Sequence, residues 1–167
     1  MPLTRLRLRK FRNLVEVELE IPAGVSVFYG ENAQGKTALV EAVYTLAIAR
    51  SFRAENEREI VNFGAASKEG LAIIEGQVED GDAGASRRVI VGYKVSGSDS
   101  PGGPGYRISK EIRVDRVRRT AGELVGLVHA VLFTALDIEL VQGPPSGRRR
   151  FLDILISQAD PLYLKTL

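Results

Sequence analysis

The chain has 167 residues, with 23 Lys and Arg against 21 Asp and Glu, a net charge of +2 and 44% hydrophobic content. It has no Cys and a single His, which excludes disulfides, thiolate metal sites and histidine-rich metal centres. No apolar run approaches the ~20 residues of a membrane span, and the N-terminus lacks the apolar core of a signal peptide, so we expect a cytoplasmic protein. The mild positive charge permits a nucleic-acid partner without arguing for one.

Two runs of period-two alternation predict a β-hairpin over residues 3–21. With the turn at Arg12-Asn13, each arginine of the first strand faces a glutamate of the second. The expected pairs are Arg5 with Glu20, Arg7 with Glu18, and Arg9 with Glu16. Such cross-strand pairs contribute on the order of 0.2–1 kcal/mol each. The arginine row could also be a DNA-binding ridge, but the facing glutamates favour a solvated ladder of ion pairs.

The next stretch matches the phosphate-binding pattern G-x-x-x-x-G-K-T, the P-loop. It is Gly30-Glu31-Asn32-Ala33-Gln34-Gly35-Lys36-Thr37. The β-branched and aromatic run Val25–Tyr29 predicts a strand before it. Residues 38–47 have helical apolar spacing and predict a buried helix, with Glu41 as the one charge in its middle. Strand, glycine loop and helix is the order that the pattern requires, which argues against a chance match in a turn.

The residue types of this loop suit a nucleotide. Gly30 and Gly35 permit backbone angles that a Cβ would forbid, so the loop can turn its N–H groups towards phosphate oxygens. The helix that follows adds unpaired N–H groups and a partial positive charge. Lys36 is expected on the β- and γ-phosphates, and the Thr37 hydroxyl is expected to ligate Mg²⁺. The sequence therefore predicts ATP and Mg²⁺ as ligands.

Residues 71–119 predict an antiparallel meander. Strands are expected at 71–78 and 87–95, and the alternation over 106–119 fits further short strands. The last segment is the most basic of the chain, through residues that include Arg113, Arg116, Arg118 and Arg119. These arginines are candidates for a DNA-binding surface, with a solvated sheet face as the alternative.

The C-terminal third predicts a short helix, a strand and a longer helix. Thr120 and Glu123 have the spacing of a capping box. Residues 128–133 predict a buried strand, and residues 146–158 predict a helix with Arg148, Arg149 and Arg150 in its first turn. Because the helix dipole disfavours cations there, these arginines are further candidates for DNA contact.

Three stretches together resemble the RecF family of bacterial DNA replication and repair ATPases. The first is the opening Leu6-Arg7-Leu8-Arg9-Lys10-Phe11-Arg12-Asn13, with Lys10 where the family usually has Asn. The second is the P-loop running through Ala49-Arg50-Ser51-Phe52-Arg53. The third is Leu140-Val141-Gln142-Gly143-Pro144-Pro145 followed by Ser146-Gly147-Arg148-Arg149-Arg150-Phe151-Leu152-Asp153. The resemblance covers nearly the whole chain.

The resemblance implies an ATPase head of the ABC type, similar to SMC heads. It implies an ATP-dependent homodimer, DNA binding at duplexes or strand junctions, and action with RecR and RecO towards RecA loading at gaps. The resemblance also implies roles in DNA recombination and in the SOS response to DNA damage. By analogy with related heads, Lys36 and Gln142 are the candidate catalytic residues, Gln142 also touches Mg²⁺, and Arg12 and Asn13 reach the nucleotide.

Two parts of such a head are not found in the sequence, namely the acidic strand end called Walker B and the signature motif. We therefore expect a single N-terminal lobe, residues 1–167, of a longer chain. Residues 1–50 and 125–167 would form the P-loop sheet and helices, and residues 71–119 the meander. The expected fold is α/β, a mixed sheet around the P-loop helix with an antiparallel meander.

This lobe is expected to bind nucleotide and to hydrolyse it negligibly, because no residue is placed as general base. Two alternatives stay open. One is the head of another SMC- or RecN-like ATPase, although no heptad repeats appear. The other is a DNA-binding module that works without nucleotide.

Overall fold

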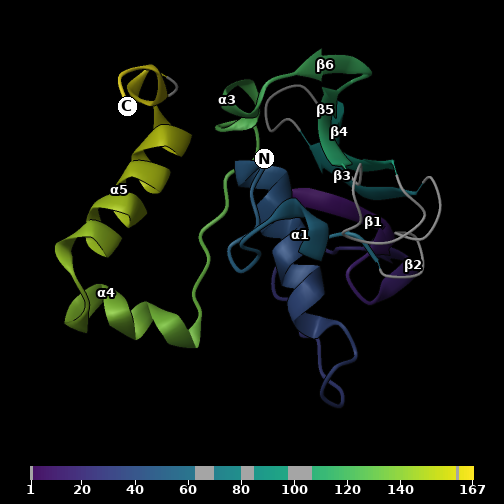
Figure 1. The fold of residues 1–167 in the computed structure, drawn as a ribbon, viewed down its shortest axis with the longest axis horizontal. Coiled ribbons are helices and arrows are strands. Elements are labelled where there is room, and N and C mark those ends of the chain that lie inside the picture. The colour runs from purple at the N-terminus through teal and green to yellow at the C-terminus, as the bar shows by residue number, and fades with distance from the viewer. Residues whose placement is uncertain (1, 63–69, 80–84, 98–106, 161) are drawn as a thin grey trace.

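The computed structural model describes residues 2–62, 70–79, 85–97, 107–160 and 162–167 (Figure 1). Its strands are β1 (Leu3–Phe11), β2 (Leu14–Glu20), β3 (Leu71–Glu79), β4 (Ser86–Ser96), β5 (Arg107–Val114) and β6 (Val117–Arg119). Its α-helices are α1 (Lys36–Ile48), α3 (Ala121–Leu124), α4 (Glu139–Gln142) and α5 (Pro145–Ala159). Short 3-10 turns are η1 (Glu57–Glu59), η2 (Ala135–Ile138) and η3 (Tyr163–Lys165).

The six strands form one sheet in the order β2-β1-β3-β4-β5-β6. The β1–β2 hairpin has the predicted register. Arg5 pairs with Glu20, Arg7 with Glu18 and Arg9 with Glu16. Because side chains alternate between the two faces of a strand, this register puts the charged residues of both strands on one face and the apolar residues on the other.

Helix α1 packs on the apolar face of the sheet, against β1, β3 and β4 (Figure 1). The sheet contributes buried side chains such as Leu8, Ile74 and Tyr93. Gly76 lies beneath Leu46 of α1, and a Cβ at Gly76 would come within 2.7 Å of the Leu46 Cδ1 atom. The missing side chain therefore lets the last turns of α1 approach the sheet closely.

The expected α/β content and antiparallel meander are confirmed, but the sheet is not mixed, because every strand pair in the described part of the chain is antiparallel. Residues 25–29 and 128–133, predicted as strands, form no strand, and Val128 makes only an isolated bridge to Val125. A β-branched run favours an extended backbone, but a strand also needs a neighbour that takes up its N–H and C=O groups. Neither segment has one among the described residues, and Val25 and Tyr29 are 90% and 91% exposed.

The expected grouping of the chain also differs. Strand β1, from the part assigned to the P-loop sheet, pairs directly with β3 of the meander, so the two parts share one sheet. Helices α4 and α5 lie to one side of α1, after the extended segment that follows α3 (Figure 1). The Gln158 side chain joins α5 to that segment, since its amide accepts from the Ala130 N–H at 2.8 Å and donates to the Ala130 carbonyl at 3.2 Å.

Candidate nucleotide-binding site

The loop from Gly30 to Thr37 adopts a backbone that depends on its glycines. Gly30 has φ 146° and Gly35 has φ 96°, both in the region that favours glycine. A Cβ on Gly35 would lie 2.5 Å from the Leu14 Cδ2 atom, so the loop can pass this close to the β1–β2 hairpin only without a side chain. The Asn13 amide donates to the Ala33 carbonyl at 2.8 Å and fixes the loop from the hairpin side.

Lys36 and the first turn of α1 give the loop its positive character. The Lys36 ammonium donates to the carbonyls of Gly30 at 2.7 Å and Glu31 at 2.5 Å, so it lies over the loop. Helix α1 has no side-chain cap at its N-terminus. Its first N–H groups therefore keep their hydrogen-bonding capacity, and the helix dipole adds positive potential where an anion would bind.

A cavity of about 560 Å³ opens beside the loop, within the size range of small-molecule sites. Its lining comes from the β1–β2 turn, the P-loop, the start of α1 and the segment that follows α1. The lining residues are Arg12, Asn13, Asn32, Ala33, Gln34, Gly35, Lys36, Thr37, Ala38, Arg53, Glu59, Val61 and Asn62. Three cations line it against one carboxylate, so the lining fits a polyphosphate anion.

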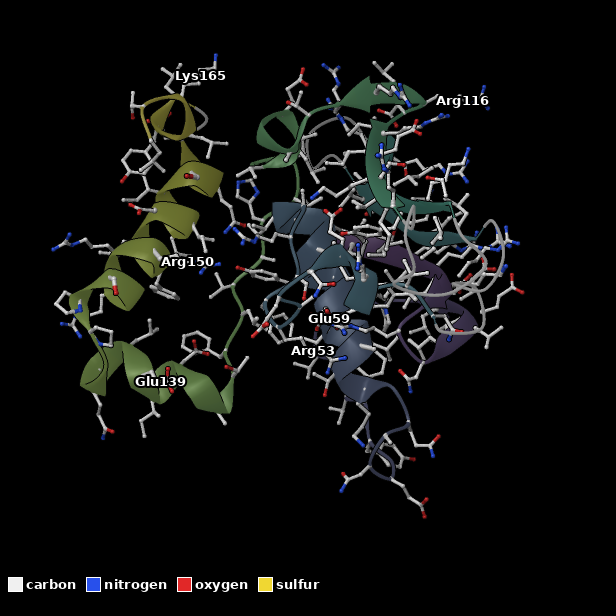
Figure 2. All side chains as sticks on the ribbon, in the orientation of Figure 1. Arg53, Glu59, Arg116, Glu139, Arg150 and Lys165 are labelled. Carbon is white, nitrogen blue, oxygen red and sulfur yellow. The ribbon has the colours of Figure 1, made fainter. Side chains whose placement is uncertain are left out.

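The glutamate of this lining, Glu59, is already engaged. Its carboxylate accepts from the backbone N–H groups of Glu55 and Asn56, both at 3.2 Å, and thereby caps η1. Figure 2 shows Glu59 and Arg53 close to α1. Thr37 is exposed at the same cavity, so its hydroxyl is accessible to a metal ion held by the phosphates. The donor set thus fits both a nucleotide and its Mg²⁺.

Arg12 reaches the cavity wall, but its guanidinium is held by protein groups. The Nη2 atom donates to a Glu41 oxygen at 2.6 Å, and Nε lies 3.0 and 3.1 Å from the two oxygens. The Nη1 atom donates to the Glu59 carbonyl at 2.8 Å. All three nitrogens are therefore bonded, so Asn13 and Arg12 shape the site through the loop and the helix.

Sequence reasoning missed the buried network around Glu41. This side chain is fully buried in the middle of α1, and it binds Ser51 and Arg53 as well as Arg12. The signal that could have revealed this network is a lone carboxylate within an otherwise apolar helix, because such a charge needs partners when it is buried. The sequence did not show which cations would supply them.

Gln142, predicted to act in catalysis and on Mg²⁺, is not brought to this cavity. It is the exposed last residue of α4, which lies apart from the P-loop (Figure 1). Among the other predicted ligands, Arg12, Asn13 and residues 32–37 line the cavity, whereas Gly30 and Glu31 are not part of its lining. The roles of Lys36, Thr37 and Gln142 remain predictions.

The predicted DNA-binding arginines of the meander are mostly in ion pairs. Arg113 and Arg118 share the Glu111 carboxylate at 2.5 and 3.0 Å, and Arg119 binds Glu123 at 3.2 Å. Hydrogen bonds from Arg118 and then Arg113 lower the pKa of Glu111 to about 2. Arg116, at the turn between β5 and β6, makes no ion pair within the described residues (Figure 2).

The arginines of α5 have separate surroundings. Arg148 donates to the Leu140 and Gly143 carbonyls at 3.1 and 2.9 Å and caps the end of α4. Arg150 lines a cavity together with Tyr44 of α1, and Arg149 is exposed. The seven arginines thus form two groups, one at β5–β6 and one on α5. Figure 2 labels one member of each group, Arg116 and Arg150.

Two further observations bear on ligand classes. Among the described residues, no group of three or more His, Cys, Asp or Glu side chains could hold a metal ion by itself. No helix in the described part of the chain is long and apolar enough to cross a membrane.

No protein-family model matches the chain. Curated relatives do match it along nearly its whole length. A protein of Chloroflexus aurantiacus named "DNA replication and repair protein RecF" is 40% identical over 165 residues, which cover 97% of this chain and 41% of the relative. A protein of the same name from Lactobacillus delbrueckii subsp. bulgaricus is 39% identical over 98% of this chain and 39% of its own length. The chain spans about two fifths of the length of these relatives.

Solved structures give the same result. One is described as the recombination mediator protein RecF-ATPrS in the RecFOR pathway. It matches with a TM-score of 0.82 and 35% identity over 98% of this chain and 40% of its own. Another, described as RecF-ATP, has a TM-score of 0.78 and 34% identity over 95% of this chain.

Proposed function

The chain is a RecF-like segment with an α/β fold of the P-loop ATPase head type, and on this premise we propose that it is the nucleotide-binding lobe of a DNA replication and repair ATPase. The observation that carries the proposal is the meeting of the P-loop, Lys36 and the uncapped start of α1 at one cavity of about 560 Å³. The similarity to RecF structures described with ATP and ATPrS supports ATP as the nucleotide.

The residues of the P-loop and its surroundings would each make a different contribution to binding ATP. Backbone N–H groups of residues 30–36 would surround phosphate oxygens, and Lys36 would exchange its carbonyl partners for the β- and γ-phosphates. The Thr37 hydroxyl would ligate Mg²⁺, which neutralises phosphate charge when bound. Asn13 would keep the loop in shape through its bond to the Ala33 carbonyl.

The segment binds nucleotide without appreciable turnover. Hydrolysis of ATP to ADP and phosphate requires a group that orients or deprotonates the attacking water. The one carboxylate among the lining residues is Glu59, which caps η1, and Glu41 beside it is held by two arginines. Neither is available as a base, so turnover belongs to the dimer of a longer protein.

In that longer protein the lobe serves an ATP-dependent homodimer that binds DNA at gaps or strand junctions. There it works with RecR and RecO to assist loading of RecA, in DNA repair, recombination and the SOS response. The similarity to RecF proteins supports these roles, and Gln142 would join the site in the same assembly. The arginines of β5–β6 and α5 are the candidate DNA contacts, and all of them are exposed.

Thermal unfolding with and without nucleotide tests the proposal. A ligand at a hundredfold excess over its Kd stabilises the folded state by about 2.7 kcal/mol, which raises the Tm of a chain of this size by roughly 5–10 °C. We expect MgATP and MgADP to raise the Tm of the wild type, and Lys36→Ala to lose this increase. Lys94→Ala, on an exposed lysine of β4 outside the cavity, should keep it.

Phosphate release is measured on the same samples. We expect no steady turnover from the segment alone. An equal Tm increase in the wild type and Lys36→Ala would overturn the nucleotide site, and steady turnover abolished by Lys36→Ala would overturn the assignment of hydrolysis to the longer protein.

A further inference from the structure

Glu41 is a fully buried carboxylate next to the proposed nucleotide site. It is shared by two arginines and a serine. The Arg12 Nη2 atom and the Ser51 hydroxyl donate to Oε1, both at 2.6 Å, and the Arg53 Nε atom donates to Oε2 at 2.8 Å. Glu41 therefore has two cationic partners, of which Arg12 also lies 3.8 Å from the Glu59 carboxylate.

The segment after α1 is shaped to bring Arg53 to this carboxylate. Ser51 accepts hydrogen bonds from the backbone N–H groups of Arg53 at 3.0 Å and Ala54 at 2.8 Å. The Ser51 hydroxyl at the same time donates to Glu41. Both the backbone and the side chain of Arg53 are thus fixed relative to α1, the helix that begins with Lys36.

The two arginines differ in how many of their guanidinium nitrogens remain without a hydrogen bond. The Arg12 side chain is 14% exposed and has all three guanidinium nitrogens bonded. The Arg53 side chain is 40% exposed and is bonded through Nε. Within the described part of the chain, its two terminal nitrogens make no hydrogen bond, and the side chain lines the same cavity as Lys36.

We infer that Arg53 is a ligand of the nucleotide phosphates and that Glu41 is the positioning residue that holds it there. The inference rests on the proposed nucleotide site. A guanidinium oriented through Nε presents its two terminal N–H groups in a fixed fork, which suits the oxygens of a phosphate. The buried Glu41 carboxylate supplies that orientation through Nε alone, so the two terminal N–H groups stay available to a phosphate.

ATP titrations of five variants by calorimetry test the inference. Hydrogen bonds to charged groups are strong enough that Arg53→Gln should weaken MgATP binding by about 10- to 100-fold. Glu41→Gln keeps the side-chain size but removes the charge, and it should weaken binding in the same direction. Arg50→Gln is the matched control, since Arg50 belongs to the same segment but does not line the cavity, and it should leave the affinity unchanged.

The double variant separates positioning from a general loss of stability. If Glu41 acts through Arg53, Glu41→Gln should cause no further weakening when Arg53→Gln is already present. Additive losses in the double variant would overturn the positioning role. If Glu41→Gln does not fold at the assay temperature, Arg53→Gln alone decides, and wild-type affinity in that variant overturns the inference.

Lys36→Ala distinguishes this result from failure of the nucleotide site itself. Loss of binding in Lys36→Ala together with full binding in Arg53→Gln overturns only the role of Arg53. Absence of MgATP binding in the wild type overturns the inference together with the site on which it rests.

Discussion

At the residue scale, two glutamates each hold a pair of arginines in different surroundings. Glu41 is buried and joins Arg12 to Arg53 at the cavity beside the P-loop, whereas Glu111 joins Arg113 to Arg118 on the surface. Removing one partner of a buried ion pair is expected to cost several kcal/mol, because a buried charge is left without compensation. Solvent screens the charges of the surface cluster around Glu111, so removing one of its partners should change the free energy of unfolding much less.

The surface cluster makes a prediction about ionisation. Hydrogen bonds from Arg118 and Arg113 lower the pKa of Glu111 to about 2, against a usual value of 4.5. A carboxylate with a lowered pKa in the folded state stabilises the fold above pH 4.5, and this contribution is lost as the pH falls towards 2. We expect a carboxyl ¹³C NMR titration to place the midpoint of Glu111 near 2, and Arg118→Gln to raise it towards 4.5.

The matched control for this titration is Arg116→Gln, in the adjoining turn. Arg116 makes no ion pair in the described part of the chain, so this variant should leave the Glu111 midpoint near 2. A wild-type midpoint at 4 or above would show that the two arginines do not hold the carboxylate in solution.

At the element scale, the β1–β2 hairpin connects a charged sheet face to the nucleotide site. Its outward arginines and glutamates pair across the strands, for example Arg7 with Glu16 at 3.4 Å. Its turn supplies Arg12 and Asn13 to the cavity. The hairpin register therefore sets where these two side chains meet the P-loop, although the ladder itself is exposed.

Reversing one charge of the ladder tests that register. Arg7→Glu would put a carboxylate opposite Glu18 on β2 and Glu75 on β3. Like charges that face each other destabilise a sheet, so we expect a loss of about 1 kcal/mol and a Tm lower by about 2–4 °C at low salt. The loss should shrink in 1 M salt, where the Debye length is about 3 Å.

Lys94→Glu is the control for this charge reversal, because Lys94 is exposed on β4 of the same sheet and makes no ion pair among the described residues. It should lower the Tm less than Arg7→Glu does. Equal effects of the two substitutions, or a loss that does not depend on salt, would argue against the ladder.

At the scale of the whole molecule, local patterns predicted the hairpin register, the start of α1 and the meander, because period-two and helical spacing report directly on which face is buried. Of the predicted loop ligands, residues 32–37 line the cavity and Gly30 and Glu31 do not, and the role of each in binding stays a prediction. Local patterns did not predict partners distant in sequence. The runs at 25–29 and 128–133 were predicted as strands but have no strand neighbour among the described residues. Glu41 obtains its cations from positions 29 residues before it and 12 after it.

The central claim is that Gly30–Thr37 and the cavity beside it bind the phosphates of a nucleotide. Isothermal titration calorimetry with ATP, with and without Mg²⁺, on the wild type and Lys36→Ala tests it most directly. We expect saturable binding with one ATP per chain, strengthened by Mg²⁺, and a loss of about 100-fold or more in Lys36→Ala. Wild-type heats that do not saturate, or equal affinities in the two proteins, would contradict it.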